Sequence, residues 1–145
     1  MALPAPAPGL VIAYSYLWFY EHNQGHEDGR KVRPAVILFA TETDTDGDLG
    51  VYVSPITHAT PPNPEVAVEI PPQVGKRLGL DDQKSWAILD EVNHFTWPGV
   101  DLGQAPVNPP SVAYGFLPPA LFAKIRTISA RLARTGQANI VPRTE

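Results

Sequence analysis

The chain has 145 residues, which suits one domain that buries roughly 70% of the surface of its unfolded chain. It has no cysteine, which excludes disulfides, thiolate metal sites and cysteine nucleophiles, and its 17 prolines favour short elements separated by turns. The net charge of -4 argues against generic nucleic-acid binding, which depends on a positive surface.

The pattern of apolar segments predicts a flexible lead-in and a series of short strands. Residues 1–8 are Pro- and Ala-rich and should be extended and poorly ordered, so that one domain occupies residues 9–145. Residues 21–32 are charged and contain glycine, which predicts a loop. Apolar or alternating segments predict five or six strands, at residues 10–20, 34–40, 51–57, 65–70, 85–94 and 112–116.

Two segments predict helices. Residues 71–80 form a short one, with proline at its start and Gly79 near its end. Residues 118–135 form an amphipathic one followed by Gly136, a typical capping residue. One face of this C-terminal helix is apolar, through Leu121, Ile125, Ile128 and Leu132. The predicted class is mainly β (α+β), a small barrel with one short helix and a C-terminal amphipathic helix.

Location and charge give further expectations. The longest apolar run, residues 9–20, is too short to span a membrane, and no Lys or Arg precedes Arg30 as a signal peptide requires. We therefore expect a cytoplasmic protein without a membrane partner. Residues 118–145 hold five basic residues and one acid, which is typical of a solvated helix face.

Known catalytic signatures are absent from the sequence: it has no phosphate-binding P-loop, GxGxxG, GxSxG or HExxH. None of the four histidines has metal-ligand spacing on a predicted helix, so we expect no metal and no cofactor. Candidate polar groups instead collect at the ends of predicted strands, namely His26, Arg33, Ser54, Thr57, Asp90, Glu91, Asn93 and His94.

In a small barrel such strand ends can converge on one rim. An arginine, a hydroxyl, an imidazole and a carboxylate could together cleave a phosphodiester without metal. The reaction needs a base for the 2′-hydroxyl, a cation for the charged phosphorus and an acid for the leaving oxygen. The alternative is ordinary turn chemistry, in which Thr57 and Asp90 bond to the local backbone.

Three segments, in order and spacing, resemble the MazF/PemK-like toxin family. They are GHEDGRKVRPAVIL at residues 25–38, VYVSPITHA at residues 51–59 and SWAILDEVN at residues 85–93. The family pattern has a glycine-rich loop before Arg-Pro-Ala-Val, a strand ending in Pro-Ile/Val-Thr, and a later strand that runs into Asp-Gln-x-Arg. The amphipathic C-terminal helix is also similar, and the likeness covers roughly residues 9–135.

The resemblance implies an SH3-like barrel, a homodimer and a metal-independent endoribonuclease that cuts single-stranded RNA. Such a growth-inhibiting toxin is blocked by a cognate antitoxin. By position, the catalytic residues would be Arg33, Thr57, His26 and Asp90. Five further residues near the strand ends are candidate substrate contacts: Arg30, Ser54, His58, Asn93 and His94.

The chain departs from the family pattern at three positions. Glu91 replaces the usual glutamine, and Asn93 and Ile88 stand where arginines are found. His94 or Arg30 could substitute for the missing cations. Two alternatives therefore stay open: a catalytically silent member of the fold that binds an antitoxin or a topoisomerase-type target, and an unrelated barrel.

A homodimer is also predicted from the first strand. Tyr14, Tyr16, Trp18 and Tyr20 alternate, so they would share one face of a strand over residues 10–20. Four aromatic side chains exceed what one barrel wall needs, and the excess could form an interface. The alternative is that all four pack on the C-terminal helix.

Overall fold

A computed structural model describes residues 3–26, 29, 31–42, 48–81 and 83–143. Eight strands and three α-helices lie in these ranges. The strands are β1 Leu10–Tyr14, β2 Arg33–Glu42, β3 Leu49–Thr57, β4 Ala67–Ile70, β5 Ser85–Ile88, β6 Glu91–Trp97, β7 Ala113–Phe116 and β8 Asn139–Pro142. The helices are α1 Phe19–Asn23, α2 Pro72–Leu78 and α3 Pro119–Arg134, with a 3-10 turn, η1, at Pro64–Val66.

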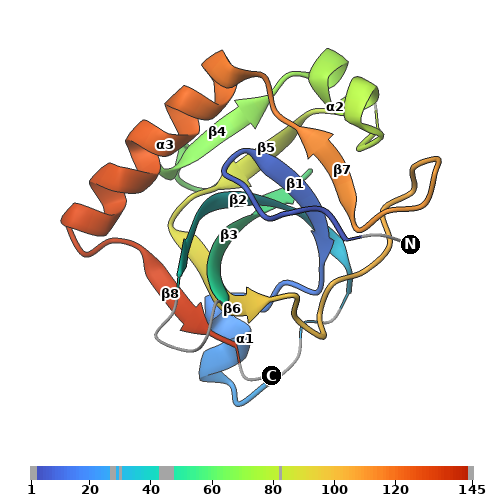
Figure 1. Cartoon of the computed structure of the whole chain (residues 1–145). Helices are drawn as coiled ribbons and strands as arrows, with labels where there is room; N and C mark the ends of the chain where they lie inside the picture. Colours follow the sequence, from blue (N-terminus) through green and yellow to red (C-terminus); the bar gives the residue numbers. More distant parts are fainter. Residues whose placement is uncertain (1–2, 27–28, 30, 43–47, 82, 144–145) are drawn as a thin grey trace.

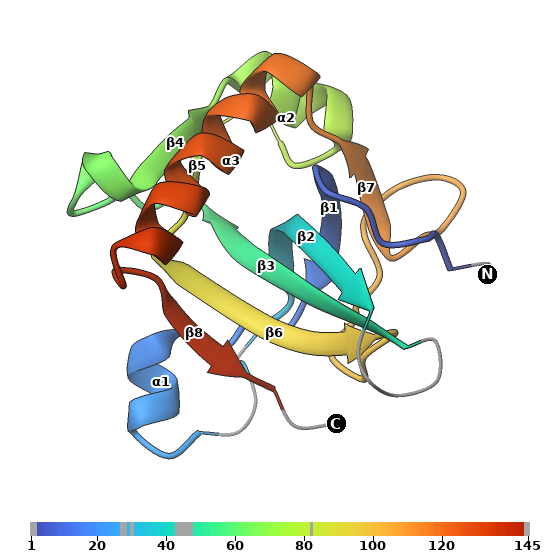
Figure 2. The same cartoon turned by 60° about the vertical axis from the view of Figure 1, so that its left-hand side comes forward.

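The strands form one strongly curled sheet, which Figures 1 and 2 show from two sides. Its main order is β4-β5-β3-β2-β1-β7, and β6 pairs with both β3 and β8. All pairs are antiparallel except β6 with β8. The protein is thus mainly β, a curled half-barrel with a few short helices, in agreement with the predicted class.

Strand β3 produces much of the curl, because two strands share one of its edges. Leu49–Val53 of β3 pair with β6, whereas Ile56 and Thr57 pair with β5. Between these two stretches lie Ser54 and Pro55, and the Ser54 hydroxyl donates to the Glu91 carbonyl oxygen at 2.7 Å. This side-chain bond holds the point where the ladder passes from β6 to β5.

One apolar cluster fills the inside of the curl. The Tyr14 ring on β1 stacks on the Phe95 ring on β6, with centroids 4.6 Å apart, although β2 and β3 separate these strands in the sheet. Such a contact requires β1 and β6 to face each other across the inside of the curled sheet. Ile12, Ile37 and Val53 belong to the same cluster.

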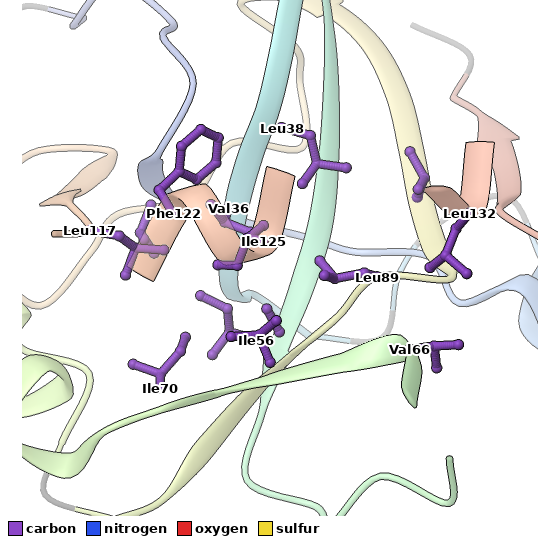
Figure 3. Packing of buried hydrophobic residues seen from close by; sticks show 14 of the residues in the cluster. Val36, Leu38, Ile56, Val66, Ile70, Leu89, Leu117, Phe122, Ile125 and Leu132 are labelled. Carbon is purple, nitrogen blue, oxygen red and sulfur yellow. The ribbon is translucent and has the colours of Figure 1, made fainter. Parts of the chain in front are cut away.

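A second cluster lies between the other face of the sheet and α3 (Figure 3). In β2, Val36 and Leu38 point to this side, while their neighbours Ala35 and Ile37 point inside the curl, as alternation in a strand requires. Figure 3 labels these members of the cluster: Val36, Leu38, Ile56, Val66, Ile70, Leu89, Leu117, Phe122, Ile125 and Leu132. The predicted apolar face of the C-terminal helix is thereby confirmed.

The first strand is shorter than predicted, and the aromatic face expected from residues 10–20 does not exist. Strand β1 ends at Tyr14, and Tyr14 and Tyr16 are fully buried inside the curl. Beyond the strand, the Asn93 side chain binds the Leu17 backbone in place of a neighbouring strand. The Leu17 N–H donates to Asn93 Oδ1 at 2.9 Å, and Asn93 Nδ2 donates to the Leu17 carbonyl oxygen at 2.8 Å. The aromatic argument for a dimer is therefore wrong, and so is the alternative that all four rings pack on α3.

Two other predictions of elements were wrong. Residues 85–94 form two strands, β5 and β6, because the chain turns at Leu89 and Asp90. Aspartate is common in turns, but Leu89 is not a usual turn residue, and the prediction ran one strand through both. Strand β8 was missed, because its parallel pairing with β6 has no local signal in NIVP. The short helix was predicted correctly: α2 ends at Gly79, whose φ of 84° is left-handed.

None of the helices in the described ranges is long and apolar enough to cross a membrane.

Candidate functional site

Arg33, at the start of β2, lies at the centre of the candidate site. It is half-buried, and its guanidinium carbon lies 5.2 Å from the centroid of the Trp18 ring, over that ring. Its Nε is buried without a hydrogen-bond partner. Burial lowers the pKa of Arg33, and the nearby negative charge of Glu21 opposes this; an arginine stays charged at neutral pH in either case.

Thr57, the last residue of β3, lies beside Arg33. The two residues line the same two cavities, so the structure brings this predicted pair together. The Thr57 Oγ1 accepts a hydrogen bond from Ala59 N–H at 3.2 Å. An oxygen that accepts in this way keeps its own hydrogen to donate to a ligand.

The first cavity, which we call the Tyr114 cavity, has a volume of about 420 Å³. Besides Arg33 and Thr57, its polar lining includes Lys31, His58, Ser85 and Tyr114. The second cavity, which we call the Trp18 cavity, has a volume of about 370 Å³ and is more apolar. Its lining beyond Arg33 and Thr57 consists of Trp18, Tyr20, Ala59, Thr60, Pro61, Pro62 and Ile88.

His58 is the only histidine among the described residues that lines either cavity. Its Nδ1 lies 2.9 Å from the Lys84 carbonyl oxygen, and its Nε2 lies 2.7 Å from Asp81 Oδ2. These bonds fix the ring at the wall of the Tyr114 cavity. Asp81 is itself held at a φ of 146°, and its Oδ1 accepts from Gln83 N–H at 2.8 Å.

The other predicted catalytic residues lie outside both cavities. His26 is exposed in the loop after α1, and its N–H donates to Glu21 O at 3.1 Å. Asp90 lies in the turn between β5 and β6, where its carbonyl accepts from Asn139 N–H and partial burial raises the pKa of its carboxyl. Arg30 is outside the described residues.

Three predicted substrate contacts have structural roles instead. Ser54 and Asn93 are fully buried and bonded within the fold, so neither side chain is available to a substrate in this structure. The His94 ring stacks on Tyr52, with centroids 4.2 Å apart, and lines neither cavity. Both Asn93 and His94 lie on β6, and neither lines a cavity that Arg33 lines.

Glu21, a buried carboxylate whose charge acts on Arg33, was not among the residues predicted for the site, and it lies near Glu91, which was. Glu91 Oε1 accepts from the Tyr16 hydroxyl at 3.1 Å and from Phe19 N–H at 3.0 Å. The pKa of Glu91 is raised to about 7, chiefly by burial, with a contribution from the charges of Asp90 and Glu21 and against the hydrogen bonds from Phe19 and Tyr16. Glu21 is also buried, and its Oε1 accepts from Trp18 N–H at 3.1 Å.

A signal for Glu21 was present in the sequence. A glutamate three residues after the N-cap, the residue just before the first helical one, is typical of a helix start. Trp18 is the N-cap of α1, and Glu21 follows it at that spacing. The Trp18 cavity had no such signal. It is assembled from α1, β2, the end of β3, the turn after it and β5, which are distant in sequence.

Comparison with known proteins adds no identification. No known protein family matches the chain, and no curated protein sequence matches it. The resemblance to the MazF/PemK-like toxins therefore enters only as part of the proposal below.

Proposed function

We propose that the protein is a MazF/PemK-like toxin: a metal-independent endoribonuclease with an SH3-like barrel that cuts single-stranded RNA and is blocked by a cognate antitoxin. The observation that supports this best is the pairing of Arg33 with Thr57 between two cavities. Arg33 offers a positive charge beside both cavities, and Thr57 offers a hydroxyl hydrogen. A phosphodiester needs such donors, because negative charge grows on its oxygens during the reaction.

In this proposal Arg33 and Thr57 bind the scissile phosphate and stabilise the charged phosphorane. The 2′-hydroxyl next to that phosphate attacks the phosphorus, its proton passes to a base, and the 5′-oxygen of the next nucleotide leaves with a proton. His58 is the histidine of the Tyr114 cavity, but both of its ring nitrogens face oxygen acceptors, so it would have to release Asp81 before Nε2 could take the proton. His26 and Asp90 would each have to approach from outside both cavities.

The decisive experiment is cleavage of a labelled, mixed-sequence single-stranded RNA in the presence of EDTA. We expect products with 5′-hydroxyl and cyclic phosphate ends, because the nucleophile is the neighbouring 2′-hydroxyl. RNA with 2′-deoxy substitution should resist cutting for the same reason. A wild-type protein that leaves long mixed-sequence RNA intact would contradict the proposal.

Substitution of Arg33 tests its role in this reaction. Arg33→Ala should lower the rate by about 10²–10³-fold, as the loss of a comparable preorganised donor does in known enzymes. Arg33→Lys should recover part of the rate, because lysine keeps the charge and loses the planar fork of donors. Arg77→Ala, an exposed arginine on α2, is the matched control and should cut like the wild type. Equal cutting by Arg33→Ala and the control would remove Arg33 from the mechanism.

One observation favours the second candidate function, a catalytically silent protein that acts by binding an antitoxin or a topoisomerase-type target. Ile88 lines the Trp18 cavity at the position where the resemblance places an arginine, so Arg33 is the only cation among the described residues that line it. Growth inhibition by the wild type and by Arg33→Ala alike, with no RNA cut by either, would support this candidate.

A further inference from the structure

We propose that the Trp18 cavity is a nucleobase subsite, which holds the base next to the phosphate bound by Arg33 and Thr57. This inference rests on the proposed function and extends it, because it assigns a binding role to Trp18, Tyr20 and the Thr60–Pro62 turn. None of these residues belongs to the site predicted from the sequence.

The Trp18 ring is held in place before any ligand arrives. It packs edge-to-face with the Tyr16 ring, with centroids 5.4 Å apart and planes at 74°, and the Arg33 guanidinium lies over the Trp18 ring. Tyr16 is itself fixed by its hydrogen bond to Glu91. A ring fixed in this way loses little conformational entropy when a base stacks on it.

The rest of the lining suits a flat, uncharged ring. Tyr20 is 54% exposed, and Pro61, Pro62 and Ile88 add apolar surface. No carboxylate among the described residues lines the cavity itself. The volume of about 370 Å³ falls within the range of about 300–1,000 Å³ that is usual for small-ligand sites.

The position of Arg33 connects the base to the phosphate. Arg33 and Thr57 line both cavities, so a phosphate bound by them would lie next to both the Trp18 cavity and the Tyr114 cavity. A strand of RNA could then place consecutive bases in the two cavities. Aromatic and proline-lined grooves also bind polyproline peptides, but the positive charge of Arg33 in the lining favours an anionic ligand.

The test measures binding without cleavage. A fluorescein-labelled 2′-O-methyl RNA heptamer, which cannot be cut, is compared by fluorescence anisotropy with an abasic backbone of the same length. The wild type should bind the heptamer about 10–100-fold more tightly than the abasic backbone, since stacking one base on an aromatic side chain contributes that much. Trp18→Ala should remove most of this difference and leave binding of the abasic backbone unchanged.

Two further variants guard against a folding defect. Trp18→Phe keeps an aromatic ring against Tyr16 and should retain most of the preference for bases. Tyr20→Ala changes an exposed side chain and should lower the preference without changing the melting temperature. Trp97→Phe, which lies on β6 outside the cavity, is the control and should bind like the wild type.

The results separate this inference from the proposed function. Binding of bases that depends on Trp18, in a protein that cuts no RNA, would support the subsite and reject the ribonuclease. Equal binding of heptamer and abasic backbone by the wild type would overturn the subsite, even if RNA is cut. Binding of neither probe, or Trp18-dependent binding of a polyproline decapeptide alone, would also overturn it.

Discussion

At the scale of single residues, the buried polar side chains divide into those that hold the fold and those near the candidate site. Asn93 and Arg143 belong to the first group: Arg143 Nη1 donates to Asn93 Oδ1 at 3.0 Å and to Ser15 O at 2.7 Å, and Arg143 forms an ion pair with Asp101 at 3.1 Å. This network ties the C-terminal end of the chain to β1 and β6. Glu91 belongs to both groups, because it holds Tyr16 and the start of α1 in place by hydrogen bonds and these elements carry the Trp18 ring under Arg33.

Asn93→Ala tests the structural role of Asn93. The substitution leaves the Leu17 N–H and C=O buried without partners and removes one acceptor from Arg143. We expect a loss of about 3 kcal/mol in the free energy of unfolding, since each unsatisfied buried polar group costs about 1–3 kcal/mol. Urea denaturation measures it, with the exposed Asn23→Ala on α1 as control. A change below about 0.5 kcal/mol, the size usual for surface substitutions, would contradict this role.

Glu91 should make the stability of the protein depend on pH. Its carboxyl has a pKa raised from 4.5 to about 7 in the folded chain, so the folded state keeps a proton that the unfolded state releases between these values. The contribution to stability is therefore present at low pH and is lost as pH rises toward 7.

Glu91→Gln should accordingly stabilise the protein at pH 8 by about 1–2 kcal/mol, allowing for solvent screening at this half-buried site. The amide oxygen can still accept from Tyr16 and Phe19. At pH 5 the variant and the wild type should differ little. Thermal melts at both pH values measure this, and an equal shift at the two values would show that ionisation of Glu91 is not the cause.

At the scale of elements, α3 holds one face of the sheet. Its buried residues Phe122, Ile125 and Leu132 pack on β2, β4 and β5, whereas its basic residues are exposed. The Arg131 side chain reaches η1, where its Nη2 donates to the Glu65 carbonyl oxygen at 2.9 Å. The positive charge of the C-terminal segment is thus mostly a solvated helix face, as predicted.

Ile125→Ala tests this packing. Ile125 is fully buried, so the substitution should lower the free energy of unfolding by about 2–5 kcal/mol, through lost burial and the cavity that remains. Lys124→Ala, the exposed neighbour, should change it by less than about 0.5 kcal/mol. Denaturation of both variants measures the contrast, and equal effects would mean that α3 is not anchored through this face.

At the scale of the whole molecule, the curl of the sheet decides what becomes a core and what becomes a site. The antiparallel pairing of β2 with β3 puts the start of one beside the end of the other, and the curl adds the further walls of the cavities that Arg33 and Thr57 share. The curl also buries Tyr14 and Tyr16, which leaves the resemblance as the only basis for a homodimer.

We nevertheless predict a homodimer, with a mass about twice the 15.8 kDa of one chain in light scattering at micromolar concentration. Exposed apolar side chains that a second copy could cover include Phe39, Phe116 and Ile140. A single-chain mass at that concentration would count against the dimer and leave the Arg33 site unaffected.

The sequence by itself determined the elements whose pattern is local. The apolar stripe of α3, the Gly79 end of α2 and most of β2 and β3 follow from periodicity and backbone preferences over a few residues. Arg33 and Thr57 were also identifiable, because both stand at the ends of apolar strands.

Only the tertiary structure decided the features that depend on distant residues. Strand β1 ends at Tyr14, and Asn93, on β6, binds the backbone that follows at Leu17. The chain turns at Leu89 and Asp90 because β5 and β6 pair with different stretches of the same edge of β3. The same curl buries Asn93, removes it from the surface and assembles the Trp18 cavity from five separate segments. No local pattern carries these outcomes, since hydrogen bonding and packing between strands far apart in the chain select them.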